Sequence, residues 1–162
     1  GFLYVGLMIK NNEPYLIEYN IRMGDPECQV IVPRLKTDIV QILIHAIENK
    51  LEKIKIEWKK QKSMTIVLCT KGYPGVYKKN LLLKNLNNIK LSKDFFIYHA
   101  GTKFLNKKLR SSGGRVLNIT SNGNDFLKIR KKIISNINKI NWKNGFYRKD
   151  IGWKVINKNE NY

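Results

Sequence analysis

The sequence has little cysteine and no long apolar segment. Its 162 residues include only two cysteines, Cys28 and Cys69, which lie far apart and form no CxxC pair. Neither a disulfide framework nor a zinc site is therefore indicated, and a reducing compartment, the cytoplasm, is expected. No run approaches the ~20 apolar residues that a membrane helix needs, so no membrane partner is expected, and no signal peptide is visible. No Ser-His-Asp or Cys-His arrangement for nucleophilic catalysis is recognisable.

Acidic residues are also scarce: 12 Asp and Glu stand against 31 Lys and Arg, which gives a formal net charge of +19. Such a charge ordinarily indicates nucleic acid or an anionic membrane surface. Here the lysines are scattered among Asn and Ile through residues 50–62, 78–108 and 128–158, which is typical of a compositional drift and not of a patch. We therefore expect an anion-binding protein with no nucleic-acid partner, and keep a basic nucleic-acid-binding module as the less favoured alternative.

The most informative stretch is residues 17–27, where polar and apolar residues alternate before a Gly-Asp-Pro turn. In a strand, this alternation places Glu18, Asn20 and Arg22 on one face. The other face carries apolar side chains that we expect to be buried: Ile17, Tyr19 and Ile21. Carboxylate and amide oxygens are ligands for Mg²⁺, and a guanidinium suits a phosphoryl oxygen. On spacing alone, an edge strand whose polar face merely meets water is the commoner explanation.

The particular residues of this stretch favour the functional explanation over the plain edge strand. The run Glu-Tyr-Asn-Ile-Arg-Met-Gly-Asp-Pro-Glu at residues 18–27, with Gln-Val-Ile-Val-Pro-Arg-Leu at 29–35, resembles the signature of the glycinamide ribonucleotide synthetase family. These ATP-grasp enzymes of purine biosynthesis are also called phosphoribosylamine–glycine ligases. Further stretches resemble the family and occur in its order: residues 1–8, 72–75, 99–102, 112–117 and 146–153.

The resemblance implies an α+β fold in two parts. Residues 1–62 would be the C-terminal portion of an ATP-grasp domain, and residues 63–162 a small β-rich C-terminal domain with one packed helix. The match covers the whole chain but less than half of a family member, so we expect a piece of a longer protein. The lysines that clasp the nucleotide, the adenine pocket and most of the phosphosugar site would lie upstream of Gly1. This piece alone is therefore expected to be inactive.

The resemblance also implies a reaction. ATP, as co-substrate, phosphorylates the carboxylate of glycine, and the amine of 5-phosphoribosylamine attacks the acyl phosphate to give glycinamide ribonucleotide, ADP and phosphate. By their positions in the motif, Glu18 and Asn20 would hold Mg²⁺ (or Mn²⁺), and Arg22 would be the catalytic residue that stabilises the transferred phosphoryl group. A cytoplasmic monomer is expected. Another carboxylate–amine ligase of the ATP-grasp group remains the alternative, because the Glu-x-Asn-x-Arg strand is widely shared.

Two further groups are candidates for substrate binding. Asp25 and Glu27 follow the motif and would orient the amine substrate or the water shell of the metal, although Asp25 is equally suited to cap a short helix beginning there. The Ser-Ser-Gly-Gly-Arg turn offers Gly113 and Gly114 as an anion nest and Arg115 as a phosphate contact. A hairpin turn with a solvated arginine explains the same residues.

The periodicities predict a series of elements. A hairpin is expected from strands at 2–9 and 15–22, with its turn at the paired asparagines. We also expect His99 to satisfy a backbone group where its strand ends. The remaining expected elements are a helix at 39–47 capped by Thr37 or Asp38, a short helix within 49–61, strands at 64–69, 95–99 and 116–120, turns at 72–75 and 110–114, a helix at 125–140, an extended piece at 146–153 and a frayed end beyond Val155.

Overall fold

The computed structural model of the chain describes residues 1–157, and its mixture of strands and helices confirms the expected α+β class. The chain divides into two compact units, the first spanning Gly1–Lys59 and the second beginning at Lys60. This division lies close to the boundary expected near residue 62. Among the described residues, no helix combines the length and the apolar character needed to cross a membrane.

The first unit begins with a hairpin of two antiparallel strands, β1 (Tyr4–Lys10) and β2 (Glu13–Asn20). Asn11 and Asn12 form its turn with φ angles of 53° and 63°, left-handed values that asparagine tolerates better than most residues. The predicted hairpin and its turn are therefore confirmed. β2 begins and ends two residues earlier than expected, because the chain bends directly after Asn20.

Short helices follow the hairpin: α1 (Cys28–Ile31), the 3₁₀ turn η1 (Val32–Arg34), α2 (Ile39–Ile47) and the 3₁₀ turn η2 (Leu51–Lys53). Asp38 caps α2 as expected, because its carboxylate accepts a hydrogen bond from the Val40 N–H at 2.7 Å. The expectation that Asp25 caps α1 is wrong. The N-cap position is Glu27, whose carbonyl accepts the first regular helical bond, from the Ile31 N–H at 3.1 Å.

The short helix expected within residues 49–61 is reduced to the single turn η2. Beyond it the chain is extended and lies beside residues 34–37. The Lys36 N–H donates to the Glu57 carbonyl at 2.9 Å, and the Lys59 N–H donates to the Arg34 carbonyl at 2.7 Å. These backbone groups find partners some twenty residues away in sequence, so they do not need helical ones.

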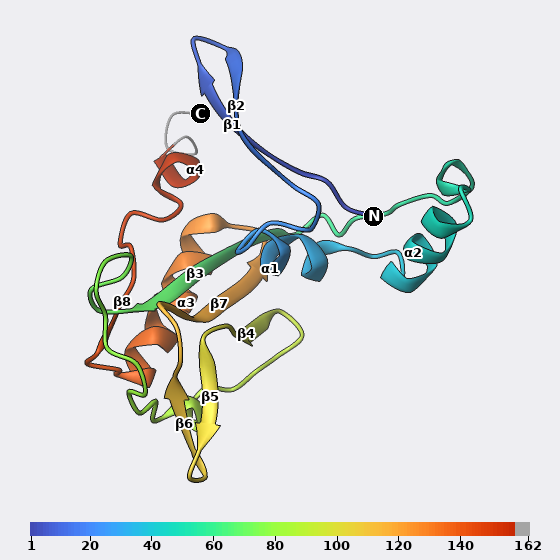
Figure 1. The fold of residues 1–162 in the computed structure, drawn as a ribbon. Helices are drawn as coiled ribbons and strands as arrows, with labels where there is room; N and C mark the ends of the chain where they lie inside the picture. Colours follow the sequence, from blue (N-terminus) through green and yellow to red (C-terminus); the bar gives the residue numbers. More distant parts are fainter. Residues whose placement is uncertain (158–162) are drawn as a thin grey trace. The chain divides into compact units, whose positions relative to one another are not determined.

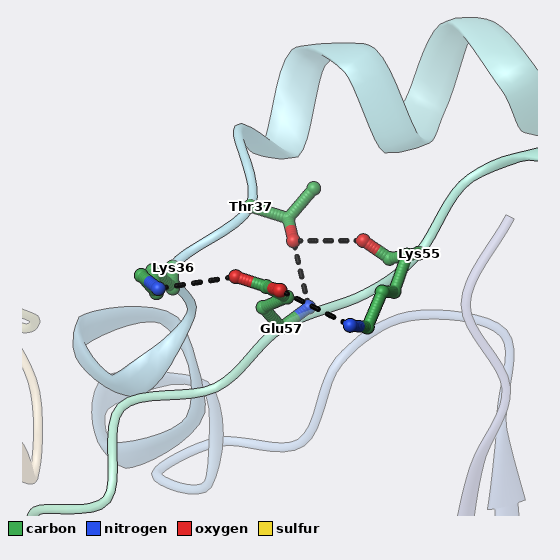
Figure 2. Close-up of polar contacts among 4 residues, drawn as sticks. All are labelled: Lys36, Thr37, Lys55 and Glu57. Carbon is green, nitrogen blue, oxygen red and sulfur yellow. Dashed lines mark hydrogen bonds and ion pairs between the residues drawn. The ribbon is translucent and has the colours of Figure 1, made fainter.

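Glu57 strengthens this pairing with side-chain contacts (Figure 2). Its carboxylate forms ion pairs with Lys36 at 3.1 Å and Lys55 at 3.4 Å, and its N–H donates to the Thr37 hydroxyl at 2.7 Å. The same hydroxyl donates to the Lys55 carbonyl at 3.1 Å. The hydrogen bond and positive charge of Lys36, followed by the hydrogen bond from Lys55, lower the pKa of the Glu57 carboxyl below its ordinary value.

The second unit is built on one antiparallel sheet with the strand order β4-β7-β3-β8. The expected strands at 64–69, 95–99 and 116–120 are all present and form its three long members. The sheet comprises β3 (Lys62–Thr70), β4 (Phe95–His99), β7 (Arg115–Gly123) and the short β8 (Gly145–Phe146).

One helix, α3 (Phe126–Ile140), packs across β3 and β7 (Figure 1). Its carboxylate cap is Asp125, which accepts from the Lys128 N–H at 2.7 Å. Branched apolar residues from the helix and the sheet form the core of the unit, as the 3.6-residue and two-residue periods predict. The principal core residues are Met64, Ile66, Leu68, Leu117, Ile119, Ile129, Ile133 and Ile137.

Several elements of the second unit differ from the expectation. A second hairpin, β5 (Thr102–Leu105) and β6 (Lys108–Ser111), takes up the first two residues of the turn expected at 110–114, so the chain turns only after Ser111. The single turn η3 (Leu86–Asn88) lies in the long connection before β4. Of the extended piece expected at 146–153, only Phe146 lies in a strand, and residues 149–152 form turns that lead into α4 (Trp153–Asn157), which buries Ile156 in the core. Ile156 and Asn157, which were expected to be frayed, belong to this helix, and the rest of that prediction falls on residues 158–162, outside the described part.

Candidate active site

The polar face of the β1–β2 hairpin brings Glu18 and Asn20 together. Glu18 is paired with Gly6 and Asn20 with Tyr4, and directly opposed residues of an antiparallel pair project from the same face. Gly6 has no side chain to compete with Glu18: a Cβ there would lie 3.1 Å from the Glu18 Cγ. The Glu18 side chain therefore passes close to Gly6, on the strand face that also carries Asn20.

The opposite face does not have the predicted burial. Ile17 and Tyr19 are each 62% exposed and Ile21 is 92% exposed. The period-two alternation is present, but β1 and β2 form a sheet of only two strands. That face consequently has no packing layer among residues 1–157.

Arg22 does not lie on the strand face with Glu18 and Asn20, as the sequence pattern suggests. β2 ends at Asn20, and the chain then bends through residues 21–22. The Arg22 guanidinium is exposed and donates from Nη1 to the Met23 carbonyl at 2.9 Å. Arg22 is therefore close in sequence to the metal-ligand candidates but is not part of the β1–β2 strand pair that carries them.

Glu27 contacts the hairpin through Tyr4, a residue that the sequence did not single out. The Tyr4 hydroxyl donates to Glu27 Oε1 at 3.2 Å. The Glu27 carboxylate beside it is the largest cause of a raised pKa for the Tyr4 phenol, with burial second and a smaller effect from Glu18. The signal that could have identified Tyr4 is its position in the 1–8 stretch of the family resemblance, in register with Asn20.

The donor set on the hairpin fits a magnesium ion. Within residues 1–157 there is no cluster of three or more His, Cys, Asp or Glu side chains placed to hold a metal. The hairpin face instead offers two hard oxygen ligands, from Glu18 and Asn20. Mg²⁺ usually takes only one or two carboxylates from the protein and completes its octahedron with water and substrate phosphates. A site of this size is therefore sufficient for a metal that arrives with a nucleotide.

The turn before Arg115 forms a separate cluster in the second unit. The N–H groups of Ser112 and Gly113 both donate to the Gly101 carbonyl, at 2.7 Å and 3.3 Å, and the Gly101 N–H donates to the Arg115 carbonyl at 2.9 Å. The Gly113 N–H of the predicted nest, and the N–H of the residue before it, are thus already paired within the protein. An anion at this turn would be met chiefly by the Arg115 side chain. Gly114 has a packing role, since a Cβ there would overlap the Tyr73 ring.

His99 is exposed at the end of β4, and its ring contacts a side chain, not the expected backbone group. Its Nδ1 lies 3.0 Å from the Thr102 hydroxyl, at the first residue of β5. The contact links two strands of the His-Ala-Gly-Thr stretch, so it explains this histidine structurally.

Comparisons with known proteins identify the family of the chain. The family model described as phosphoribosylglycinamide synthetase, C domain, matches residues 63–154, and the model for the ATP-grasp (A) domain of the same enzyme matches residues 1–28. The chain is similar to the phosphoribosylamine–glycine ligase of Agrobacterium fabrum, with 42% identity over 96% of the chain and 36% of that protein. It is also similar to the chloroplastic phosphoribosylamine–glycine ligase of Arabidopsis thaliana, with 39% identity over 96% of the chain and 30% of that protein.

A solved structure gives the same result. The crystal structure of phosphoribosylamine–glycine ligase from Thermotoga maritima matches with a TM-score of 0.69 and 31% identity, over 93% of this chain and 36% of that one. The chain therefore spans about a third of the length of these relatives. Since the C-domain model covers more than half of the 162 residues, the chain belongs to the phosphoribosylglycinamide synthetase family.

Proposed function

We propose that this chain supplies the C-terminal part of a ligase that uses ATP to join glycine to 5-phosphoribosylamine, giving glycinamide ribonucleotide, ADP and phosphate. Residues 1–62 would contribute to the ATP-grasp domain, and residues 63–162 would form the C domain. The observation that carries the proposal is that Glu18 and Asn20 share one face of β2, in a chain whose relatives are named phosphoribosylamine–glycine ligase.

The reaction is balanced as two displacements. An oxygen of the glycine carboxylate attacks the γ-phosphorus of ATP, and the bond to the β–γ bridging oxygen breaks to release ADP. The amine nitrogen of 5-phosphoribosylamine then attacks the carbonyl carbon of the acyl phosphate. Phosphate leaves with the electrons of the C–O bond, and the nitrogen loses a proton. Such chemistry asks the protein for positioning and charge neutralisation and needs no nucleophilic side chain.

Glu18 and Asn20 would hold Mg²⁺ or Mn²⁺ with their side-chain oxygens. When bound, the ion would neutralise the charge of the ATP phosphates. Arg22, exposed just past β2, would provide the fixed cation for the transferred phosphoryl group. The three side chains lie within five residues of one another in sequence, so an ion held by the first two and the guanidinium would act on the same polyphosphate.

The remaining candidates would bind the substrates. Asp25 and Glu27 offer carboxylates to an ammonium or amine group, next to the metal-ligand candidates in sequence. In the second unit, Gly113 and Gly114 shape the turn and Arg115 would contact a phosphate. We further propose that the protein is a cytoplasmic monomer that acts on small molecules and not on nucleic acid or membranes. The acidic side chains of the hairpin would repel a nucleic-acid backbone.

The test is turnover by the full-length gene product. ADP release is measured with ATP, Mg²⁺, glycine and freshly prepared 5-phosphoribosylamine, and each substrate is omitted in turn. The proposal predicts release that requires both glycine and the amine, and none from residues 1–162 alone. ADP release that requires a different acid or amine would indicate another ATP-grasp ligase. Absence of any ATP-dependent turnover would contradict the proposal.

A further inference from the structure

Tyr4 joins the two parts of the candidate site in the first unit. In the hairpin register it is paired with Asn20, so its ring projects from the face that carries Glu18 and Asn20. Its hydroxyl donates to Glu27 Oε1 at 3.2 Å, across 23 residues of sequence. One side chain therefore contacts the carboxylate that follows the motif while standing beside a candidate metal ligand.

The main chain packs closely against this contact at Gly24. Gly24 is buried, and a Cβ at that position would overlap Glu27 Oε2 and lie 2.8 Å from the Tyr4 Cε2 atom. The hydrogen at this Cα is thus all that separates the main chain from the tyrosine ring and the carboxylate. The Gly in the Gly-Asp-Pro-Glu run is explained by this close approach as much as by its turn.

The hydrogen bond leaves the carboxylate able to bind something else. An ionised carboxylate accepts hydrogen bonds at about four lone-pair positions, and the Tyr4 hydroxyl uses one of them. Glu27 is only partly buried, so its remaining positions are accessible to a small cation. A donated hydrogen bond from a neighbouring strand fixes the carboxylate rotamer before a substrate arrives.

We propose that Tyr4 is a positioning residue, which holds the Glu27 carboxylate in place to receive the ammonium or amine group of a substrate. This inference rests on the proposed function, because it assigns Glu27 a cationic, nitrogen-bearing ligand. A purely structural role, in which the bond only ties α1 to the hairpin, makes a different prediction. Loss of such a tie would affect all substrates alike, whereas loss of positioning affects the substrate that Glu27 contacts.

The test compares steady-state constants of the full-length gene product carrying Tyr4→Phe, which removes only the hydroxyl. Tyr19→Phe is the matched control, because Tyr19 lies on β2 but is 62% exposed. We expect Tyr4→Phe to raise the KM of glycine or of 5-phosphoribosylamine about ten-fold, as for a hydrogen bond to a charged group. The KM of ATP should change by less than about two-fold, and adding Tyr4→Phe to Glu27→Gln should have little further effect.

A second measurement needs no turnover. Titration of carbon-13-labelled tyrosine by NMR, with the Tyr4 signal assigned through its loss in Tyr4→Phe, should show that Glu27→Gln lowers the pKa of Tyr4. Glu13→Gln, at the far end of β2, should leave that pKa unchanged. If the wild-type protein shows no glycine-dependent turnover, the proposed function fails, while this titration still decides whether Glu27 holds Tyr4. An unchanged Tyr4 pKa in Glu27→Gln, or equal increases in all three KM values in Tyr4→Phe, would overturn the inference.

Discussion

Gly101 lies at a point where the backbone leaves no room for a side chain. A Cβ there would lie 2.6 Å from the Arg115 carbonyl oxygen and 2.7 Å from both the N and Cα of Gly113. These are main-chain atoms of a turn that is closed by hydrogen bonds to Gly101 itself. They cannot move aside as the tip of a flexible side chain would.

We therefore expect Gly101→Ala to destabilise the protein by about 1–3 kcal/mol, as for overpacking of a tight site. Gly113→Ala is the matched control, since its nearest contact would be a single Cα at 3.3 Å, and it should cost clearly less. Chemical denaturation followed by the fluorescence of Trp142 and Trp153, which lie in the same unit, measures both. Equal free energies of unfolding for the two variants would contradict this account of the turn.

Glu57 makes a pH-dependent contribution to the stability of the first unit. Its carboxyl pKa is lowered from its ordinary value of 4.5 in the folded chain by Lys36 and then Lys55. A group with a lower pKa in the folded state stabilises that state fully above its unfolded pKa and loses this effect as the pH falls through the folded value.

Glu57→Gln should accordingly lower the melting temperature at about pH 7, and the difference from wild type should shrink towards about pH 3. Glu52→Gln, in the neighbouring turn η2, is the control and should show no such trend. The measurement is thermal unfolding across the pH series. A difference that stays constant down to the lowest pH would show that the ion pairs of Glu57 do not stabilise the fold.

At the scale of elements, the helix caps show which features are local enough to be predicted. Asp38 was predicted as a cap and Asp125 only as the first residue of a helix; each precedes a 3.6-residue apolar period, and each accepts the capping hydrogen bond. We expect Asp125→Ala to reduce stability by about 1 kcal/mol, while Asp125→Asn, which keeps an acceptor oxygen, should cost much less. Chemical denaturation of both variants checks this, and equal losses would exclude capping as the role of Asp125.

Elements that depend on distant partners were predicted less well. Residues 55–59 are apolar and charged in a pattern compatible with a helix, yet their backbone pairs with residues 34–37, which no local period reveals. The β5–β6 hairpin was missed although Asn106 and Lys107 occupy left-handed turn positions, because its strands are only four residues long. The burial expected for one face of β2 was wrong because period-two alternation does not say whether a second layer is present.

The candidate site divides in the same way. Glu18 and Asn20 were placed correctly on one strand face from their spacing, since β-strand geometry fixes which side chains share a face. Arg22 was extrapolated past the end of the strand. Tyr4 lies in the 1–8 stretch of the family resemblance but was not singled out, because its contact with Glu27 depends on hairpin register and on the path of the chain after Gly24.

At the scale of the whole molecule, family membership and the net charge of +19 concern different properties. The charge is spread along the chain, and the best-defined site is acidic. A basic surface around such a site would attract ATP and a phosphosugar over distances up to about a Debye length. The charge is therefore compatible with the proposed ligase without specifying any nucleic-acid sequence.

The central claim is that β2 presents the metal-binding side of an ATP-dependent ligase. The most direct measurement is glycine-dependent ADP release by the full-length gene product, comparing wild type with Glu18→Gln and with Glu13→Gln at the start of the same strand. The account predicts a loss of about a hundred-fold or more in Glu18→Gln, as for removal of a charge that acts on the transferred group, and wild-type turnover in Glu13→Gln. Undiminished turnover in Glu18→Gln would contradict it.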